Sequence, residues 1–357
     1  MKKGNYVSEW FGQRIYPDVR VEAKAISRAN AGVCPFLSSI RRAKTNCIKN
    51  ENSFGVCTIN SANKDWLVCP YRVIDTEIVR SGCETVFAIE RCSAPIPVSI
   101  LQDTRGVAAL NECLNKDGHA FIFFQDKLGG EISINGTPSS PEISFDVTVV
   151  EVAKGATGGI RVLRYGFIEI QTMDFHGSYK AAVTNLRDAH RLHGKKFPRE
   201  LAQNQGWASE NVEGPNIANV FKRTFYQTLL KFELSKEGAA AGTVLALPES
   251  VWESWQPFLG RPTIQAVIGS TFRIAGTDNE TYHGTNAWIF VFRLDEKADQ
   301  PISPVNITTR IRVSATDLVQ HAFISVPKNM LHVASSEDEL LRRIRDRIRK
   351  ACRFSVE

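Results

Sequence analysis

The middle of the chain has the short hydrophobic period of β-strands. Residues 119–124 form an unbroken apolar run that predicts a buried strand, and residues 131–134 alternate like a half-buried one. Residues 143–149 place apolar side chains on one face and Asp146 on the other. After a glycine-rich turn, residues 161–171 predict a further strand. Several strands therefore follow one another before any long helix.

Helical periodicity interrupts and follows these strands. Residues 106–113 and 219–234 have the spacing of helices, whereas residues 243–247 and 288–294 predict strands around a helix start at 248–252. Interleaving of this kind is typical of a mixed sheet with helices on its faces. The predicted fold class is α/β.

Composition and length fit a globular protein that stays in the cytoplasm. The 357 residues allow one large or two medium domains, and 43% hydrophobic with 23% charged residues is ordinary. The longest apolar stretches, such as 287–292, are too short to cross a bilayer, so no membrane association is expected. The first residues are basic without a following apolar segment, which argues against a secretory signal. The net charge of +6 permits a polyanionic partner.

Four of the eight cysteines lie in the first seventy residues, in a turn-rich segment that also contains several basic side chains. They are Cys34, Cys47, Cys57 and Cys69, separated by 12, 9 and 11 residues. Reduced cysteines in this arrangement fit either buried thiols or a tetrahedral iron or zinc site, and the Cys-x2-Cys pair of common zinc modules is missing. We interpret residues 1–75 as a small irregular module held by such a site. The remaining cysteines, Cys83, Cys92, Cys113 and Cys352, are expected to be ordinary thiols.

Acidic residues in the predicted strands form the candidate catalytic site. If the strands that contain Asp146 and Glu169 pair as a hairpin, both carboxylates lie near one point, and Gln171 projects from the same strand face as Glu169. Glu131 can approach from the preceding element. Mg²⁺ prefers carboxylate oxygens and can activate water for phosphodiester hydrolysis. The same spacing also fits polar side chains on the solvent face of a sheet.

The order Asp, turn, Glu-x-Gln resembles the PD-(D/E)xK nuclease core, with Gln171 where the usual lysine stands. Longer segments resemble the NotI-like type II restriction endonucleases. These segments are CPFL (34–37), GVC (55–57), DWLVCP (65–70), FQDKLGGE (124–131), SSPEISFD (139–146), IEIQTMDFHGSYK (168–180) and EGPNIANVFKRTFYQ (213–227). The resemblance runs from about Trp10 to Leu294 and does not cover the C-terminus.

The resemblance implies a Mg²⁺-dependent homodimer that cleaves double-stranded DNA at a GC-rich palindrome. Such an enzyme works in the bacterial cytoplasm beside a cognate DNA methyltransferase. Asp146 and Glu169 would bind Mg²⁺, Glu131 would complete or orient the site, and Gln171 would position water or phosphate. The family also uses Glu-x-Gln, and it holds a metal, typically iron, on four cysteines in its DNA-binding N-terminal part.

Polar and basic residues near these motifs are candidates for DNA contacts. Arginine and lysine read guanine and also bind phosphates, so each candidate fits both roles. The candidates are Arg41, Arg42, His176, Asn216, Asn219, Lys222 and Arg223. For His176, a structural hydrogen-bonded histidine is the alternative.

The last segment, residues 331–357, is predicted to be a basic helix that follows a nuclease core over residues 76–330. A capping-box pattern at 336–339 precedes a run that only Asp346 offsets: Arg342, Arg343, Arg345, Arg347, Arg349, Lys350 and Arg353. This helix fits either a solvated helix with a favourable dipole or a DNA-backbone contact.

For the whole chain, the alternatives to a restriction enzyme are a non-catalytic metal-stapled DNA-binding protein and a structure-specific repair nuclease.

Overall fold

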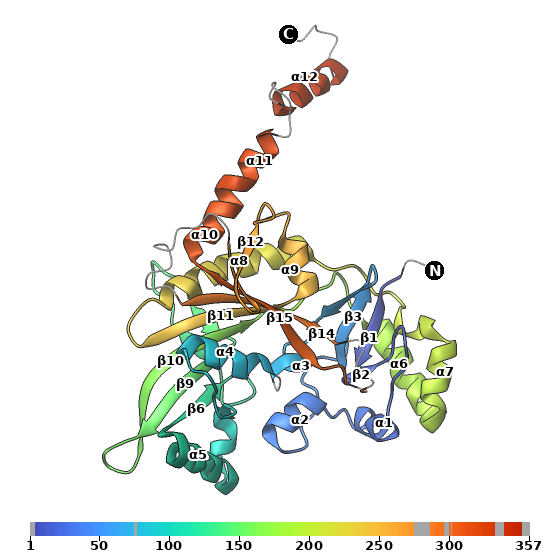
Figure 1. Ribbon diagram of the computed structural model, residues 1–357. Helices are drawn as coiled ribbons and strands as arrows, with labels where there is room; N and C mark the ends of the chain where they lie inside the picture. The colour runs from blue at the N-terminus through green and yellow to red at the C-terminus, as the bar shows by residue number, and fades with distance from the viewer. Residues whose placement is uncertain are drawn as a thin grey trace.

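The computed structural model confirms the predicted α/β class, since a large mixed sheet is flanked by helices (Figure 1). It describes residues 4–74, 77–274, 286–295, 300, 302–332 and 339–351. Residues 336–338 of the predicted capping box, together with Cys352 and Arg353, lie outside the described residues.

The central sheet has nine strands in the order β12-β13-β15-β14-β11-β10-β9-β6-β5. The strands β6, β9 and β10 are antiparallel, whereas β10, β11 and β14 run parallel to one another. Their bounds are β5 Ile96–Pro97, β6 His119–Phe124, β9 Val147–Lys154, β10 Ile160–Ile170, β11 Ala240–Pro248, β12 Ile264–Ile268, β13 Thr271–Ile274, β14 Ala287–Leu294 and β15 Val305–Val313.

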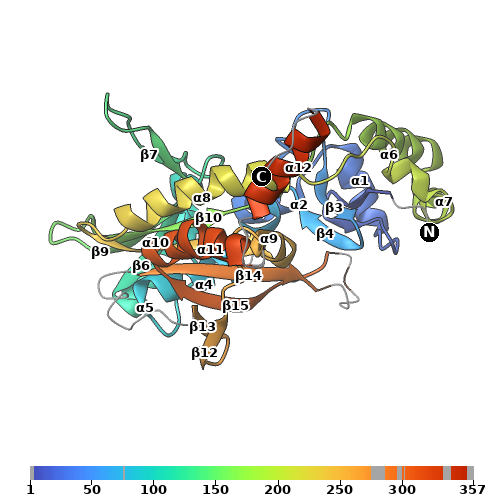
Figure 2. The ribbon, with the colours of Figure 1, turned by 90° about the horizontal axis from the view of Figure 1, so that it is seen from above.

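Two cores lie on opposite faces of this sheet. Along β11, Val244 and Ala246 enter the core that contains α4 (Glu77–Phe87), while Leu245 and Leu247 enter the core that contains α8 (Ile217–Leu234). Because the central strands are buried on both sides, their sequences are apolar without alternation. Figure 2 shows α8 running along one side of the sheet.

Most of the predicted elements are confirmed, with two corrections. The helix around 106–113 is α5 (Thr104–Asp117), and the helix start near 248 is α9 (Glu249–Trp255). The single strand expected over 143–149 is instead broken at Asp146, between β8 (Ile143–Phe145) and β9. The strand β7 (Ile132–Ile134) pairs only with β8 and is exposed along its length rather than half-buried, so the β7–β8 ribbon projects from the body (Figure 2).

Residues 4–74 are more regular than the sequence suggested. They form a four-stranded sheet in the order β2-β1-β3-β4 and three helices. Every residue of β3 is buried, so the strand shows no alternation in its sequence. The bounds are β1 Tyr6–Trp10, β2 Gln13–Arg14, β3 Val56–Ser61, β4 Lys64–Leu67, α1 Ala23–Asn30, α2 Pro35–Arg41 and α3 Tyr71–Ile74.

This N-terminal sheet shares both cores with later parts of the chain. Val7 and Trp10 belong to the core that contains Leu186 of α6 (Lys180–His193), and Leu67 of β4 belongs to the core with α4. Further short elements on this side are α7 (Phe197–Gln203) and the 3-10 turns η2 (Gly194–Lys196) and η3 (Gln205–Ala208), whereas the 3-10 turn η1 (Val98–Gln102) packs against α5.

A buried ion pair ties the N-terminal sheet to α3. The Arg72 guanidinium donates to both carboxylate oxygens of Glu9 at 2.9 and 3.0 Å, and the two side chains are 1% and 0% exposed. Thr58 Oγ1 donates to the same carboxylate at 2.6 Å, and Arg72 also donates to the carbonyl of Ser303. The charges are therefore fully enclosed by fixed partners.

Beyond α10 (Ala315–Val319), whose Ala315 and Leu318 belong to the core that contains α8, the C-terminal segment extends away from the body (Figure 1). It consists of a π-helical turn (Gln320–Ser325), α11 (Val326–His332) and α12 (Glu339–Ala351), of which α12 is the predicted basic helix. None of the helices within the described residues has the length and apolar character needed to cross a membrane.

Candidate active site

Asp146 and Glu169 meet at the break between β8 and β9. The pairing of Val147 with Ile168 places the two acidic residues side by side on adjacent strands. The backbone N–H of Asp146 donates to Glu169 Oε1 at 3.4 Å, and the N–H of Ile170 donates to Asp146 Oδ2 at 2.9 Å. The predicted convergence of these carboxylates is confirmed.

Lys231, which the sequence analysis did not select, completes this pair from the opposite side. Its Nζ, near the C-terminal end of α8, donates to Glu169 Oε2 and lies 5.5 Å from the centre of the Phe145 ring. The two paired side chains are 6% and 10% exposed. Burial, and then the charge of Asp146, raise the pKa of Glu169 to about 8, while Lys231 opposes this shift.

The three groups open into a polar cavity of about 180 Å³. Gln171 lines it beside Glu169, as the strand period predicted, and its side-chain oxygen accepts a hydrogen bond from Thr224 Oγ1. The α8 side of the cavity consists of Arg223, Thr224, Gln227, Thr228 and Lys231. Positions 224, 228 and 231 lie on one face of a helix. A polar stripe on the buried face of α8 is therefore the sequence pattern that could have identified Thr224, Thr228 and Lys231 as residues of the site.

Glu131 lies beside the cavity and is not among the residues that line it. It precedes β7, at the base of the projecting ribbon, and is exposed overall. Partial desolvation of its carboxyl, followed by the charges of Asp146 and Asp126, raises its pKa. Its carboxylate is therefore close enough to Asp146 for the two charges to interact.

Most of the candidate DNA contacts gather around the start of α8. His176 donates its backbone N–H to the Gly214 carbonyl at 3.0 Å, and Asn216 donates to the Asp174 carbonyl at 2.8 Å. Arg223 forms an ion pair with Asp174 at 2.9 Å, on the edge of the cavity. His176, Asn219, Lys222 and Arg223 are exposed, and Asn216 is half-buried.

Arg41 and Arg42 lie apart from this group, at the end of α2. Arg41 is half-buried and donates from Nε to the Lys127 carbonyl at 3.1 Å, so it supports the loop that leads to Glu131. Arg42 is exposed and ends α2 in a left-handed conformation.

The four N-terminal cysteines lie in one neighbourhood. Burial raises the pKa values of Cys34, Cys57 and Cys69, and that of Cys34 reaches about 11. The charge of Cys69 further raises the pKa values of Cys34 and Cys57. Cys47, half-buried, adds to the shifts of Cys34 and Cys69. Thiols of this kind are suitable donors for iron or zinc. In the part of the chain that the structure describes, however, no three His, Cys, Asp or Glu side chains form a metal-ligand group.

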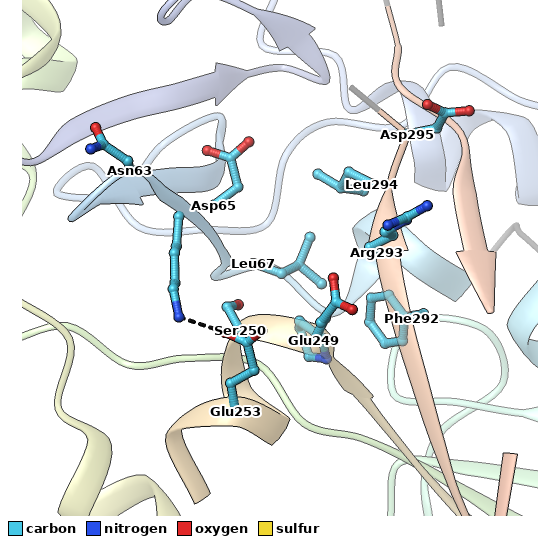
Figure 3. A pocket seen from close by; sticks show the side chains of 12 residues that line it. Asn63, Asp65, Leu67, Glu249, Ser250, Glu253, Phe292, Arg293, Leu294 and Asp295 are labelled. Carbon is cyan, nitrogen blue, oxygen red and sulfur yellow. Dashed lines mark hydrogen bonds and ion pairs between the residues drawn. The ribbon is translucent and has the colours of Figure 1, made fainter. Parts of the chain in front are cut away.

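A second hollow, of about 400 Å³, lies between β4, α9 and β14 (Figure 3). Its charged groups include two pairs: Lys64 bonds to Glu253, and Asp65 bonds to Arg14. Although it is larger than the carboxylate cavity, none of the predicted site residues lines it. The carboxylate cavity is therefore the candidate active site.

No protein-family model matches this chain, and no curated protein matches it significantly.

Proposed function

We propose that the chain is a NotI-like type II restriction endonuclease with a PD-(D/E)xK nuclease core. It would hydrolyse double-stranded DNA at a GC-rich palindrome as a homodimer, alongside a cognate methyltransferase in the bacterial cytoplasm. The observation that carries this proposal is the meeting of Asp146, Glu169 and Lys231 in one cavity with Gln171.

The residues present fit a catalytic Mg²⁺. This ion usually keeps several waters and needs only one or two protein carboxylates, and Asp146 with Glu169 supply two. When bound, it supplies Lewis acidity and lowers the pKa of a coordinated water. Glu131, beside Asp146, would orient or complete the acidic set. Gln171, fixed by Thr224, would position water or a phosphate oxygen.

Lys231 supports the proposal because it supplies the cation that the local motif lacks. The nuclease pattern normally has a lysine two residues after the second acid, where this chain has Gln171. In the folded protein an ammonium group reaches Glu169 from α8 instead. A fixed positive charge at that point would stabilise the negative charge that develops on a phosphate during cleavage.

For the N-terminal cysteines we propose structural iron or zinc. The four thiols lie in one neighbourhood and their chemistry suits either metal, which supports this assignment. Metal binding would require the thiols to lose their protons, whereas burial favours the protonated thiols. Elemental analysis of the purified protein tests it: stoichiometric iron or zinc that Cys69→Ser removes is expected, and its absence from native protein would refute the assignment.

The test of the main proposal is digestion of plasmid and genomic DNA with Mg²⁺. Discrete fragments with common end sequences are expected, together with loss of cutting in chelator and binding without cutting in Ca²⁺. Sequence-specific binding without any cutting would instead indicate a non-catalytic DNA-binding protein. Cutting only at branched or damaged DNA would indicate a repair nuclease.

A further inference from the structure

Three adjoining hollows follow the end of α2, and they share residues with one another. Their volumes are about 410, 270 and 500 Å³. Arg42 lines the first two hollows, and Ser39 lines the first and third. They therefore form one continuous surface over α1, α2, α4 and α5.

Positive charge dominates this surface. We define the Arg42 surface as five exposed basic side chains that line the hollows: Arg28, Arg42, Lys44, Arg80 and Arg105. Within the residues that the structure describes, none of the five forms an ion pair or a side-chain hydrogen bond.

Among the described residues, two acidic ones line the same hollows, and both have local partners. Asp103 accepts a hydrogen bond from the N–H of Gly106 and caps α5, and Glu77 accepts one from Ser81. The hollow in Figure 3 is different, because its basic residues lie among Asp65, Glu249, Glu253 and Asp295. The Arg42 surface thus differs in charge balance from that hollow.

The Arg42 surface is connected to the candidate active site. Arg41, which shares the middle hollow with Arg42, donates to the carbonyl of Lys127, and the Lys127 charge acts on the carboxyl of Glu131. The Arg42 surface therefore adjoins the loop that leads to Glu131.

We propose that the Arg42 surface binds the phosphate backbone of duplex DNA outside the cleaved sequence. This inference rests on the proposed function and adds a second DNA-contact region to the enzyme. Separated cations, with the hydroxyls of Ser27 and Ser39 lining the same hollows, suit a repeating phosphate chain. Such contacts add affinity that does not depend on base sequence and that weakens with salt.

The experiment compares two charge-reversal triples that lower the net charge equally. The test variant is Arg42→Glu/Arg80→Glu/Arg105→Glu. The control is Lys195→Glu/Lys196→Glu/Arg199→Glu, whose exposed side chains lie in η2 and α7 and line none of the three hollows. Binding is measured in Ca²⁺ on a short duplex that holds little more than the mapped site and on one with long flanks, over a range of salt.

At moderate salt, the native protein and the control are expected to bind the long duplex at least about tenfold more tightly than the short one. The test triple is expected to lose this preference for the long duplex. Its slope of log affinity against log salt on the long duplex should fall by about 2–3, since each lost phosphate contact removes about one. On the short duplex the test triple should match the control.

A test triple that retains the length preference, or a control that loses it equally, overturns the inference while the nuclease proposal stands. If native protein cuts no DNA but binds long random duplexes through the Arg42 surface, the inference stands and the nuclease proposal fails. No binding to duplexes of either length refutes both.

Discussion

Two buried carboxylate–cation pairs in this protein have similar chemistry and different surroundings. Glu9 and Arg72 are sealed, with both carboxylate oxygens bonded and further partners in Thr58 and Ser303. Glu169 and Lys231 are nearly as buried, but they face a cavity, and a second carboxylate lies beside them.

The difference separates a structural pair from a functional one. A closed pair holds its charges with fixed hydrogen bonds, so it joins elements but offers nothing to a ligand. In the open pair, burial and then the charge of Asp146 raise the pKa of Glu169 to about 8, so a bound cation would stabilise its ionised form. Matched substitutions at the two pairs test this distinction.

The largest effect is expected on cleavage when the open pair loses an oxygen ligand. Glu169→Gln or Asp146→Asn should slow single-turnover cleavage by at least about 10³-fold, or about 4 kcal/mol of barrier, because each removes a charged metal ligand. Binding to the cleaved sequence in Ca²⁺ serves as the control and should persist. Cutting at the native rate would place the active site elsewhere.

The same change in the closed pair should affect stability instead. Glu9→Gln removes the negative charge that faces the buried Arg72 guanidinium, so the free energy of unfolding should fall by about 3–5 kcal/mol in denaturant titrations. Glu169→Gln should change it by less than about 1 kcal/mol, since Asp146 remains near the cavity-facing Lys231. Equal losses at the two sites would show that both pairs are structural.

Lys231 should matter for cleavage through its charge. Lys231→Met is expected to slow cleavage about 10²-fold, which is near 3 kcal/mol, while Lys231→Arg retains most of the rate because it keeps a cation beside Glu169. Single-turnover rates at saturating DNA distinguish this from weaker binding. Equal rates for the methionine and arginine variants would exclude a role for the charge.

The smallest effect concerns pH and a histidine in the core shared by the N-terminal sheet. His190 packs between the rings of Trp10 and Phe197, and its two ring nitrogens are buried without hydrogen-bond partners within the described residues. Burial lowers its pKa, so unfolding takes up a proton and stability falls as pH drops below the unfolded value of about 6.5. His190→Phe should reduce the loss of stability between pH 7.5 and 5, because the variant has no imidazole to take up the proton on unfolding. An unchanged pH profile of the unfolding midpoint would contradict this.

The sequence predicted the parts of the site that are close along the chain. Asp146, Glu169 and Gln171 follow from the strand period and a hairpin, both of which depend on local geometry. Lys231 and Thr224 reach the same cavity only because α8 packs against β11, and nothing in the residues around Glu169 encodes that contact.

The errors in the predicted fold have related causes. In β3 both faces are buried, so the strand lacks the alternation that would have identified it. Conversely, Ile132 and Ile134 alternate with polar residues but are exposed, because the β7–β8 ribbon leaves the main sheet at Asp146. Periodicity reports which residues share a face, and it does not say what covers that face.

The sharing of both cores by the N-terminal sheet affects how the chain folds during synthesis. Asn5 bonds to the carbonyl of Val212, and Arg72 bonds to that of Ser303, across 207 and 231 residues. The first strands therefore leave the ribosome long before their partners exist, and contacts of such long range form slowly. Until α6 and α7 have been made, Trp10 lacks the rings of His190 and Phe197 that cover it in the folded protein.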